Sequence, residues 1–370
     1  MKRAGWIFIL SCAVQFAACD YNRASYVSLF DPAKIASVIG TEFVDSDGVD
    51  SYRVISWIYV DYGNNVYVGD PTIGKIDKYN KFGRYVMTIG GPGQGPGEFS
   101  RGFPVFCADS KGYVLTSVMK AISIFDDKGK YLEDIAYPDD FKGYYCAKIK
   151  ADHNDDVVIL LFNTNAEFAY LKFSRADKSF RPFHADAGRK GKYSSIFRFT
   201  PDYDFDDHNN IYILDSVDNR IYIYDPSGKP IKTIAKNAKK HRITAKDLFF
   251  SRGNHVVEKF PEANLKGLTG DTAYFPVNYG INIDGGVIFL WKSDLDADYK
   301  HIVEIFDNEF RFLGRSSYYN LMNSNTVHMR NGFAYVLNIG DEDREYKRNF
   351  GRAGLFNPPT KIICYRYDFP

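Results

Sequence analysis

The sequence has few of the features that mark metal-binding, disulfide-stabilised or nucleic-acid-binding proteins. It contains five cysteines in 370 residues, and none stand in Cys-x-x-Cys spacing, so neither a zinc site nor a disulfide framework is indicated. Its 47 basic and 46 acidic side chains nearly cancel, which excludes the strongly basic surface that nucleic acid requires. The chain also lacks Gly-x-Ser-x-Gly, His-Glu-x-x-His and phosphate-loop motifs, so no motif identifies a catalytic centre.

The apolar run near the N-terminus is too short for a stable membrane-spanning helix. It covers residues 6–16, follows Lys2 and Arg3, and ends in small residues before Cys19, which is the layout of a bacterial secretory signal. Small residues before a cysteine resemble a lipoprotein cleavage box, so we expect residues 1–19 to be a lipoprotein signal peptide and Cys19 to carry lipid. A plain cleaved signal is the alternative. The first reading predicts a protein held at the cell envelope, on the outer membrane, by its lipid anchor only.

Three cysteines remain after the signal and the lipidated residue are set aside. Cys107, Cys146 and Cys364 each stand in or beside a β-patterned run, which favours buried free thiols. A disulfide between Cys107 and Cys146 is the open alternative in an oxidising compartment.

An aromatic residue followed by a small polar residue recurs six times along the chain. Successive copies are roughly 50 residues apart, with longer intervals before the last two, and a repeat of this length is typical of propellers. The copies are Tyr79-Asn80, Phe125-Asp126, Phe173-Ser174, Tyr224-Asp225, Phe306-Asp307 and Tyr367-Asp368.

The unit at residues 104–136 shows how one repeat is built. Turn signals that begin at Asp109 and Asp126 separate short apolar or alternating runs, which predicts four antiparallel strands. Such a sheet cannot bury both faces alone, so it must stack against similar sheets. The sequence therefore predicts an all-β fold, a six-bladed β-propeller of four-stranded antiparallel blades.

We expect one propeller domain over residues 36–370, preceded by a tether at residues 20–35. Residues 36–46 could add a strand to the last blade and close the ring. Between blades four and five, residues 237–272 have a helical period broken by glycine and proline, which predicts a short helical insertion there.

The segment between the first two predicted blades supports a family resemblance. Residues 92–99 read Pro-Gly-Gln-Gly-Pro-Gly-Glu-Phe, which resembles the Gly-x-Gly-x-Gly-Glu-Phe linker of NHL-repeat propellers. The chain from Cys19 onward is similar to the NHL-like (TolB-like) six-bladed propeller lipoproteins of Gram-negative bacteria. The resemblance implies the propeller fold and an envelope location, whereas most members of that family have no assigned activity.

Propellers usually bind ligands at the channel end where the loop before each inner strand meets the loop between the second and third strands. A mouth lined there by aromatic rings and arginines suits a sugar or a peptide that carries a carboxylate. The alternative is that the rings pack between blades and the arginines pair with acids. The candidates are Arg101, Phe103, Tyr144, Tyr145, Arg198, Phe199, Tyr274, Phe275, Trp291, Asp70 and Asp215.

Two functions of different classes fit these observations. The first is a non-catalytic binding protein, expected to be a monomer, whose partner is a glycan, a peptide or another envelope protein. It needs no cofactor. The second is a metal-dependent hydrolase or lyase of the six-bladed propeller type, which would hold a Ca or Zn ion in its channel with several Asp, Glu, Asn or His side chains. No catalytic residue is assigned under either hypothesis.

Overall fold

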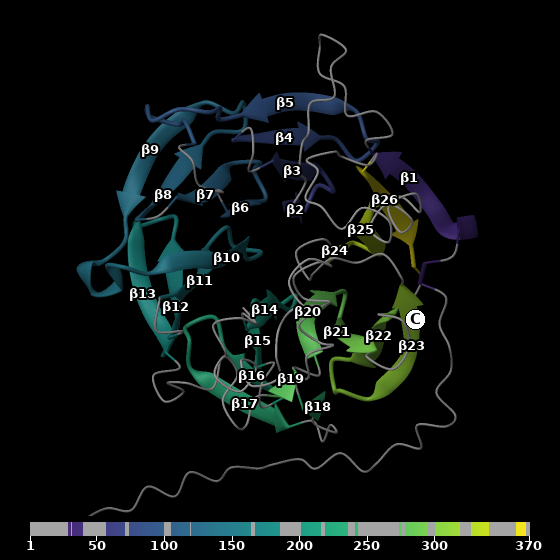
Figure 1. Cartoon of the computed structure of the whole chain (residues 1–370). Helices are drawn as coiled ribbons and strands as arrows, with labels where there is room; N and C mark the ends of the chain where they lie inside the picture. Colours follow the sequence, from purple (N-terminus) through teal and green to yellow (C-terminus); the bar gives the residue numbers. More distant parts are fainter. Residues whose placement is uncertain are drawn as a thin grey trace, which may run out of the picture.

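Six four-stranded antiparallel sheets stand around one axis in the computed structural model (Figure 1). This arrangement confirms the six-bladed β-propeller that the sequence repeat predicts. The structure describes residues 29–30, 32–39, 57–70, 74–99, 105–118, 120–163, 167–185, 201–215, 219–235, 241–242, 274–275, 278–294, 300–318, 327–339 and 360–367.

Blades 1 to 5 each run from an inner to an outer strand in chain order. Blade 1 holds β2 (Trp57–Val60), β3 (Val66–Asp70), β4 (Lys75–Tyr79) and β5 (Tyr85–Ile89). Blade 2 holds β6 (Val105–Ala108), β7 (Val114–Val118), β8 (Ala121–Phe125) and β9 (Tyr131–Ala136), followed by the 3-10 helix η3 (Asp139–Phe141). Blade 3 holds β10 (Tyr145–Ala151), β11 (Val157–Phe162), β12 (Phe168–Ser174) and β13 (Ser179–Ala185).

Blades 4 and 5 repeat this order on the other side of the ring. Blade 4 holds β14 (Asp202–Phe205), β15 (Ile211–Asp215), β16 (Arg220–Tyr224) and β17 (Pro230–Ala235). Blade 5 holds β20 (Asn278–Asp284), β21 (Val287–Asp294), β22 (Lys300–Asp307) and β23 (Phe312–Tyr318).

Blade 6 joins the two ends of the propeller. It contains β24 (Val327–Arg330), β25 (Phe333–Ile339) and β26 (Thr360–Arg366), and its fourth strand is β1 (Ile35–Ile39), which follows the 3-10 helix η2 (Pro32–Lys34). β1 pairs antiparallel with β26, so a strand from near the start of the chain completes the blade formed by its end. The hydrogen bonds between these two strands close the ring (Figure 1). β1 overlaps the segment in which the sequence predicts a closing strand.

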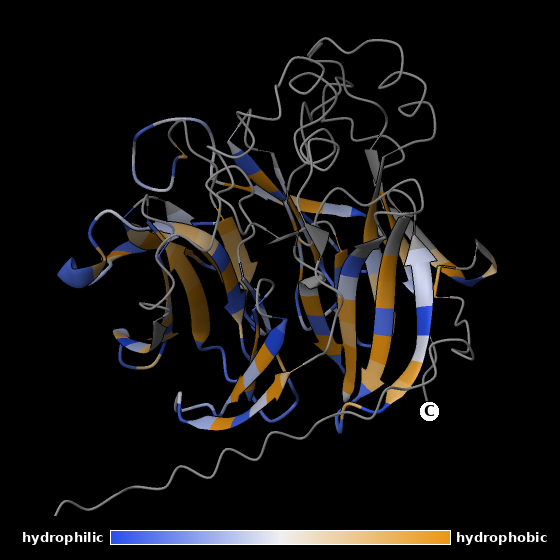
Figure 2. Ribbon diagram, turned by 60° about the horizontal axis from the view of Figure 1, so that its bottom comes forward, coloured by the Kyte–Doolittle hydropathy of each residue, from blue (hydrophilic) through white to orange (hydrophobic). Residues whose placement is uncertain are grey.

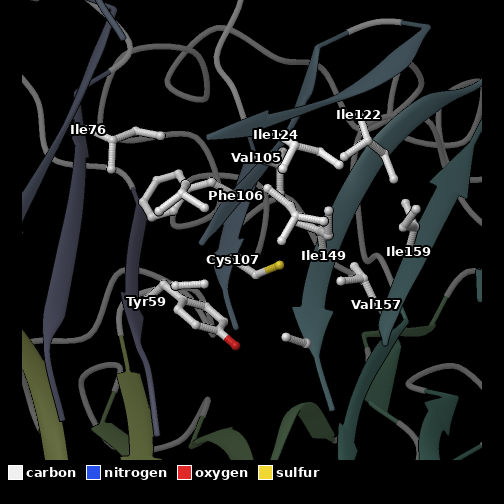
Figure 3. Packing of buried hydrophobic residues seen from close by; sticks show 14 of the residues in the cluster. Tyr59, Ile76, Val105, Phe106, Cys107, Ile122, Ile124, Ile149, Val157 and Ile159 are labelled. Atoms are coloured by element: carbon white, nitrogen blue, oxygen red, sulfur yellow. The ribbon is translucent and has the colours of Figure 1, made fainter. Parts of the chain in front are cut away.

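The inner strands are the most buried part of each blade because neighbouring blades cover both of their faces. β2, β6 and β14 are buried at every position, whereas the outer strand β9 alternates between half-buried and exposed residues. Apolar residues fill the strands and polar residues gather at the turns (Figure 2). Apolar clusters lie at every interface between adjacent blades, and the largest joins blades 1, 2 and 3 (Figure 3).

In blades 1 to 5 the repeated aromatic-polar pair lies at the end of the third strand, where the chain turns into the fourth strand. Asp126 Oδ1 accepts hydrogen bonds from the amides of Lys128 (3.0 Å) and Lys130 (2.8 Å), which closes the turn after β8. Asn80, Asp225 and Asp307 do the same in blades 1, 4 and 5. A carboxylate or amide oxygen bonded to its own backbone favours such turns, which explains why the pair recurs.

The glycine-rich linker between blades 1 and 2 is anchored by Phe99. This side chain is buried in the cluster of blades 1 to 3, and its amide donates to the Gly91 carbonyl at 2.7 Å. Gly90 has φ +70°, and a Cβ there would lie 2.2 Å from the Phe99 ring. Only glycine fits this position, which accounts for part of the linker motif.

A two-stranded ribbon stands between blades 4 and 5, where the sequence predicts a helical insertion. β18 (His241–Arg242) pairs with β19 (Tyr274–Phe275), so two of the residues assigned to the insertion are in a strand. The rest of residues 237–272 lie outside the described residues.

Candidate functional site

The six inner strands surround one axis but differ in chemistry. β2 and β6 read Trp-Ile-Tyr-Val and Val-Phe-Cys-Ala and carry no charged side chain. The other four inner strands contribute buried charged, amide or imidazole groups. These groups are Lys148 and Lys150 on β10, Asp202 and Asp204 on β14, Asn282 on β20, and His328 and Arg330 on β24.

Two buried ion pairs join blades 3 and 4. Alternate residues of a strand face the same side, so Lys148 and Lys150 both face blade 4, where Asp202 and Asp204 alternate in the same way. Lys148 pairs with Asp202, and Lys150 Nζ lies 3.0 Å from Asp204 Oδ1. Burial lowers the pKa of Lys148, and the charge of Asp202 opposes that shift.

The two carboxylates are also bound by backbone amides. Asp202 Oδ1 accepts from the amide of Tyr203 at 2.8 Å, and its Oδ2 accepts from the amide of Ile281 at 3.0 Å. Asp204 Oδ2 accepts from the amide of Ile283 at 3.0 Å. Asp202 and Asp204 therefore join blade 4 to blade 5 as well as to blade 3.

His328 and Arg330 bring a second group of polar side chains to the axis from blade 6. The ring of His328 lies 5.0 Å from the ring of Tyr59, centroid to centroid. Burial, followed by the charges of Lys150, Arg330 and Lys148, holds the pKa of His328 well below its usual range, so the imidazole is neutral. The guanidinium carbon of Arg330 lies 4.3 Å from the centroid of the Tyr62 ring, a cation–π contact.

Four polar atoms of this group are buried without a hydrogen bond among the residues that the structure describes. They are Tyr59 Oη, Lys150 Nζ, His328 Nδ1 and Arg330 Nε. The Lys150 ammonium lies within ion-pair distance of Asp204, but the two groups are not oriented to form a hydrogen bond. Buried polar groups are normally hydrogen-bonded, so four unsatisfied atoms around one axis indicate a place for an acceptor.

A cavity of about 10 Å³ lies between the same strands, which is room for about one water-sized particle. It is lined by residues of blades 1, 3, 5 and 6: Trp57, Ile58, Tyr59, Lys148, Ile149, Lys150, Asn282, Val327 and His328.

At the turn end of the ring, where the first strand of each blade turns into the second, side chains join separate blades. The hydroxyl of Tyr62 in blade 1 donates to the carbonyl of Ala151 in blade 3 at 3.2 Å, across the axis. Asn331 Nδ2 in blade 6 donates to the Tyr62 carbonyl at 3.0 Å. The amides of Asn331 and Gly332 both donate to Asp284 of blade 5 at 2.7 Å. Tyr62 therefore joins blade 1 to blade 3, which the chain does not connect directly, and Asn331 joins blade 6 to blades 1 and 5.

A larger hollow of about 120 Å³ lies between blades 3 and 4, away from the axis. Its lysine, Lys172, already bonds Asp152 Oδ2 (3.0 Å) and the Pro226 carbonyl (3.2 Å), and it pairs with Asp156. Lys172 is thus fully engaged, unlike Lys150. The other cation of the hollow, Arg181, is exposed to solvent and lies 3.5 Å from Asp177, so we regard the channel as the candidate site.

The structure places some of the predicted mouth residues in the core and others at the surface. Tyr145 begins β10 and is 42% exposed, and Tyr144 is half-buried beside Phe141. Asp70 ends β3, and Asp215 ends β15 and is buried. Trp291 is buried in the cluster of blades 5 and 6. Its Nε1 donates to the channel residue Asn282 at 2.9 Å.

Of the other predicted residues, only Tyr274 and Phe275 lie in the described part of the chain. Tyr274 and Phe275 form β19 and pair with Arg242 and His241. Outside the described residues lie Cys19, Arg101, Phe103, Arg198 and Phe199. Ligand binding by the predicted set remains a prediction.

Sequence reasoning missed the polar residues of the inner wall. A signal for them exists in Lys-Ile-Lys at residues 148–150 and Asp-Tyr-Asp at residues 202–204, which place like charges two residues apart inside strand patterns. Such spacing puts both charges on one face of a strand. Two complementary patterns in consecutive repeats could have indicated a buried ionic interface between neighbouring blades.

The described residues contain no group of three or more His, Cys, Asp or Glu side chains placed to hold a metal ion. Within the same residues, no helix has the length and apolar character needed to cross a membrane. Cys107, Cys146 and Cys364 form no disulfide with one another, and burial raises the pKa of Cys146 to about 12.

Comparison with known proteins supports the fold through structure alone. No protein-family model and no curated protein sequence matches the chain. A protein of Bacteroides fragilis that is thought to be exported aligns with a TM-score of 0.54 and 11% identity, over 93% of this chain and 98% of its own. A member of the DUF4221 family from Bacteroides vulgatus aligns with a TM-score of 0.52 and 7% identity, over 86% and 93% of the two chains.

A luciferin-regenerating enzyme is similar to the same degree. It aligns with a TM-score of 0.50 and 13% identity, over 85% of this chain and 94% of its own. The fold is therefore shared with an enzyme as well as with a protein thought to be exported, and at these identities it carries neither role to this chain.

Proposed function

We propose that the chain is an exported envelope lipoprotein whose propeller binds an anionic ligand in its channel without transforming it. The observation that carries this proposal is the inner wall, where Lys148, Lys150 and Arg330 are all buried around the axis. A carboxylate-bearing glycan or peptide is the ligand class that suits such a wall, because ionised acceptors form strong hydrogen bonds with lysine and arginine. Export rests on the signal-like pattern of residues 1–19.

The alternative, a metal-dependent hydrolase or lyase, is disfavoured by the same wall. A divalent cation needs carboxylate oxygens that are free to turn toward it. Asp202 and Asp204 instead accept from the amides of blade 5 and pair with lysines. Three cations near the axis would also repel the ion.

A binding screen tests the proposal. Purified protein is applied to arrays of neutral glycans, uronate-containing glycans and peptides, and hits are measured by titration calorimetry. We expect affinity for carboxylate-bearing members only, and a drop of at least tenfold in the Lys150→Met variant, because a charge-assisted hydrogen bond contributes about 1.5–3 kcal/mol. The matched control is Lys128→Met, since Lys128 is an exposed turn residue. Equal affinity in both variants, or turnover of a bound compound, would contradict the proposal.

The predicted mouth residues are tested on the same ligand. Replacement of Arg101 and Arg198 together should weaken binding if the ligand extends from the channel to the mouth. Retained affinity would confine the site to the inner wall.

The anchor is tested separately from binding. Replacing Cys19 with Ala should release the protein from membrane fractions into the soluble fraction. Unchanged fractionation would remove the lipid anchor from the proposal and leave the binding site untouched.

A further inference from the structure

The buried charges of the inner wall do not balance. Lys148, Lys150 and Arg330 supply three cations, whereas Asp202 and Asp204 supply two carboxylates. His328 adds no charge, because burial and then its cationic neighbours lower the pKa of the imidazole and keep it neutral. In the part of the wall that the structure describes, one buried positive charge is therefore left over, and an uncompensated buried charge is strongly destabilising.

The carboxylates at the turn end do not accept from the unsatisfied atoms of the wall, because their oxygens bond other groups. Asp61 accepts from the amides of Gly63 (2.9 Å) and Asn65 (2.8 Å) and from the Tyr67 hydroxyl (3.1 Å). Asp284 accepts from blade 6 through both oxygens, and Asp152 pairs with Lys172. These carboxylates serve the turns and the contacts between blades.

The unsatisfied atoms are mainly donors. Lys150 Nζ, Arg330 Nε and Tyr59 Oη each carry a hydrogen without an acceptor among the described residues, and His328 Nδ1 can also donate in one tautomer. A water molecule could accept from two of them but would leave the charge unbalanced. An anion in the cavity can accept from the three that line it, Tyr59, Lys150 and His328, and brings the negative charge that a water molecule lacks.

The cavity limits the size of that anion. At about 10 Å³ it holds one water-sized particle, so a single-atom ion or the end of one carboxylate fits, and sulfate or phosphate does not. The charge excess agrees with this limit, since it calls for one negative charge rather than two.

We infer that the channel binds one monovalent anionic group between Tyr59, Lys150 and His328, either a halide ion or a single carboxylate. The group neutralises the third cation of the wall and accepts the hydrogen bonds that the protein leaves open there. The carboxylate form rests on the proposed function, in which the ligand carries that group, whereas the halide form requires no further ligand.

The experiment measures the thermal unfolding midpoint of the purified full-length protein against sodium bromide, sodium acetate and sodium sulfate at constant ionic strength. A ligand that binds only the folded state raises the midpoint with a saturable dependence on its concentration. We expect saturation with bromide and none with sulfate. Crystals grown in bromide should show one anomalous peak per chain, beside Tyr59 and Lys150.

Two variants decide whether the channel is the site. Tyr59→Phe removes one hydroxyl and no charge, and should weaken bromide binding about tenfold. Tyr85→Phe is the matched control, since the Tyr85 hydroxyl is on the surface and bonds Thr88. Equal bromide affinity in the two variants, no saturation, or a peak elsewhere would overturn the inference.

The acetate titration shows whether the bound group is a carboxylate or an inorganic ion. Competition between acetate and bromide assigns the site to a carboxylate, and absence of competition assigns it to an inorganic ion. If bromide binds while the glycan and peptide screen finds nothing, the proposed function fails and this inference stands. If a glycan or peptide binds with no bromide effect, only this inference fails.

Discussion

Strands β6 and β14 occupy equivalent inner positions in their blades, yet one is apolar and the other carries two carboxylates. β6 packs Phe106 and Cys107 into the cluster shared by blades 1, 2 and 3 (Figure 3). β14 directs Asp202 and Asp204 at lysines of blade 3 and at amides of blade 5. The innermost strand thus contributes apolar packing in blade 2 and buried charged groups in blade 4.

The difference shows which parts of the ring the propeller needs for its fold. Apolar contacts alone hold the interface of blades 1 and 2, so buried ion pairs are not a requirement of this architecture. A buried pair adds little net stability, because the cost of removing two charges from water offsets their attraction. The architecture alone therefore does not account for the charges on β10, β14 and β24, which agrees with the anion-binding role proposed above.

The largest effect is expected on the apolar side. Phe106 is wholly buried, and Phe106→Ala should lower the free energy of unfolding by about 3–5 kcal/mol, since it leaves a cavity in the largest cluster. Urea unfolding measures this change. Ligand or bromide affinity of the folded variant should be unaltered, and a loss of affinity would weaken the distinction between the two sides.

A slightly smaller effect is expected when the charged side loses one partner. Asp202→Asn keeps an acceptor for the Ile281 amide but leaves Lys148 buried without its carboxylate, at a cost of about 3 kcal/mol. Adding Lys148→Met should restore at least half of that stability. A double-mutant cycle by urea unfolding gives the coupling; strictly additive costs would mean that the pair does not act as a unit.

The charged and the apolar side should also differ in how strongly they make the free energy of unfolding depend on pH. The folded pKa of His328 lies well below its ordinary value of 6.5, so the unfolded chain binds the proton more readily. His328 therefore contributes its full stability above pH 6.5 and loses it as pH falls below that value, by up to about 1.4 kcal/mol per pH unit. His328→Gln should flatten the stability profile between pH 6.5 and 5. If the slope of stability against pH is unchanged in this variant, other titrating groups dominate the pH dependence.

The smallest effect is expected in turns that both sides share. Asp126→Ala in blade 2 and Asp225→Ala in blade 4 each remove a carboxylate that accepts two or more turn hydrogen bonds. Each should cost about 1 kcal/mol, on either side of the ring. Thermal unfolding at fixed pH compares the stability of the two variants. A much larger cost in blade 4 would mean that its turn also supports the charged wall.

The sequence contained most of the scaffold. The spacing of pairs such as Phe125-Asp126 predicts the number of blades, and the alternation within each repeat predicts four strands. The glycine linker before Phe99 predicts the path from blade 1 to blade 2, and the segment overlapping β1 predicts ring closure. These features depend on neighbours in the chain or on a repeated local pattern, so a single sequence reveals them.

The inner wall was decided by tertiary structure. Lys150, Asp204 and His328 are far apart in the chain, and no local pattern states that closing six blades brings them to one axis. The sequence by itself determined the repeated strands and turns, because hydrogen bonds to nearby backbone and the period of apolar residues set them. Only closure of the ring decided which charges are buried together, because burial and pairing depend on the blades that meet across the channel.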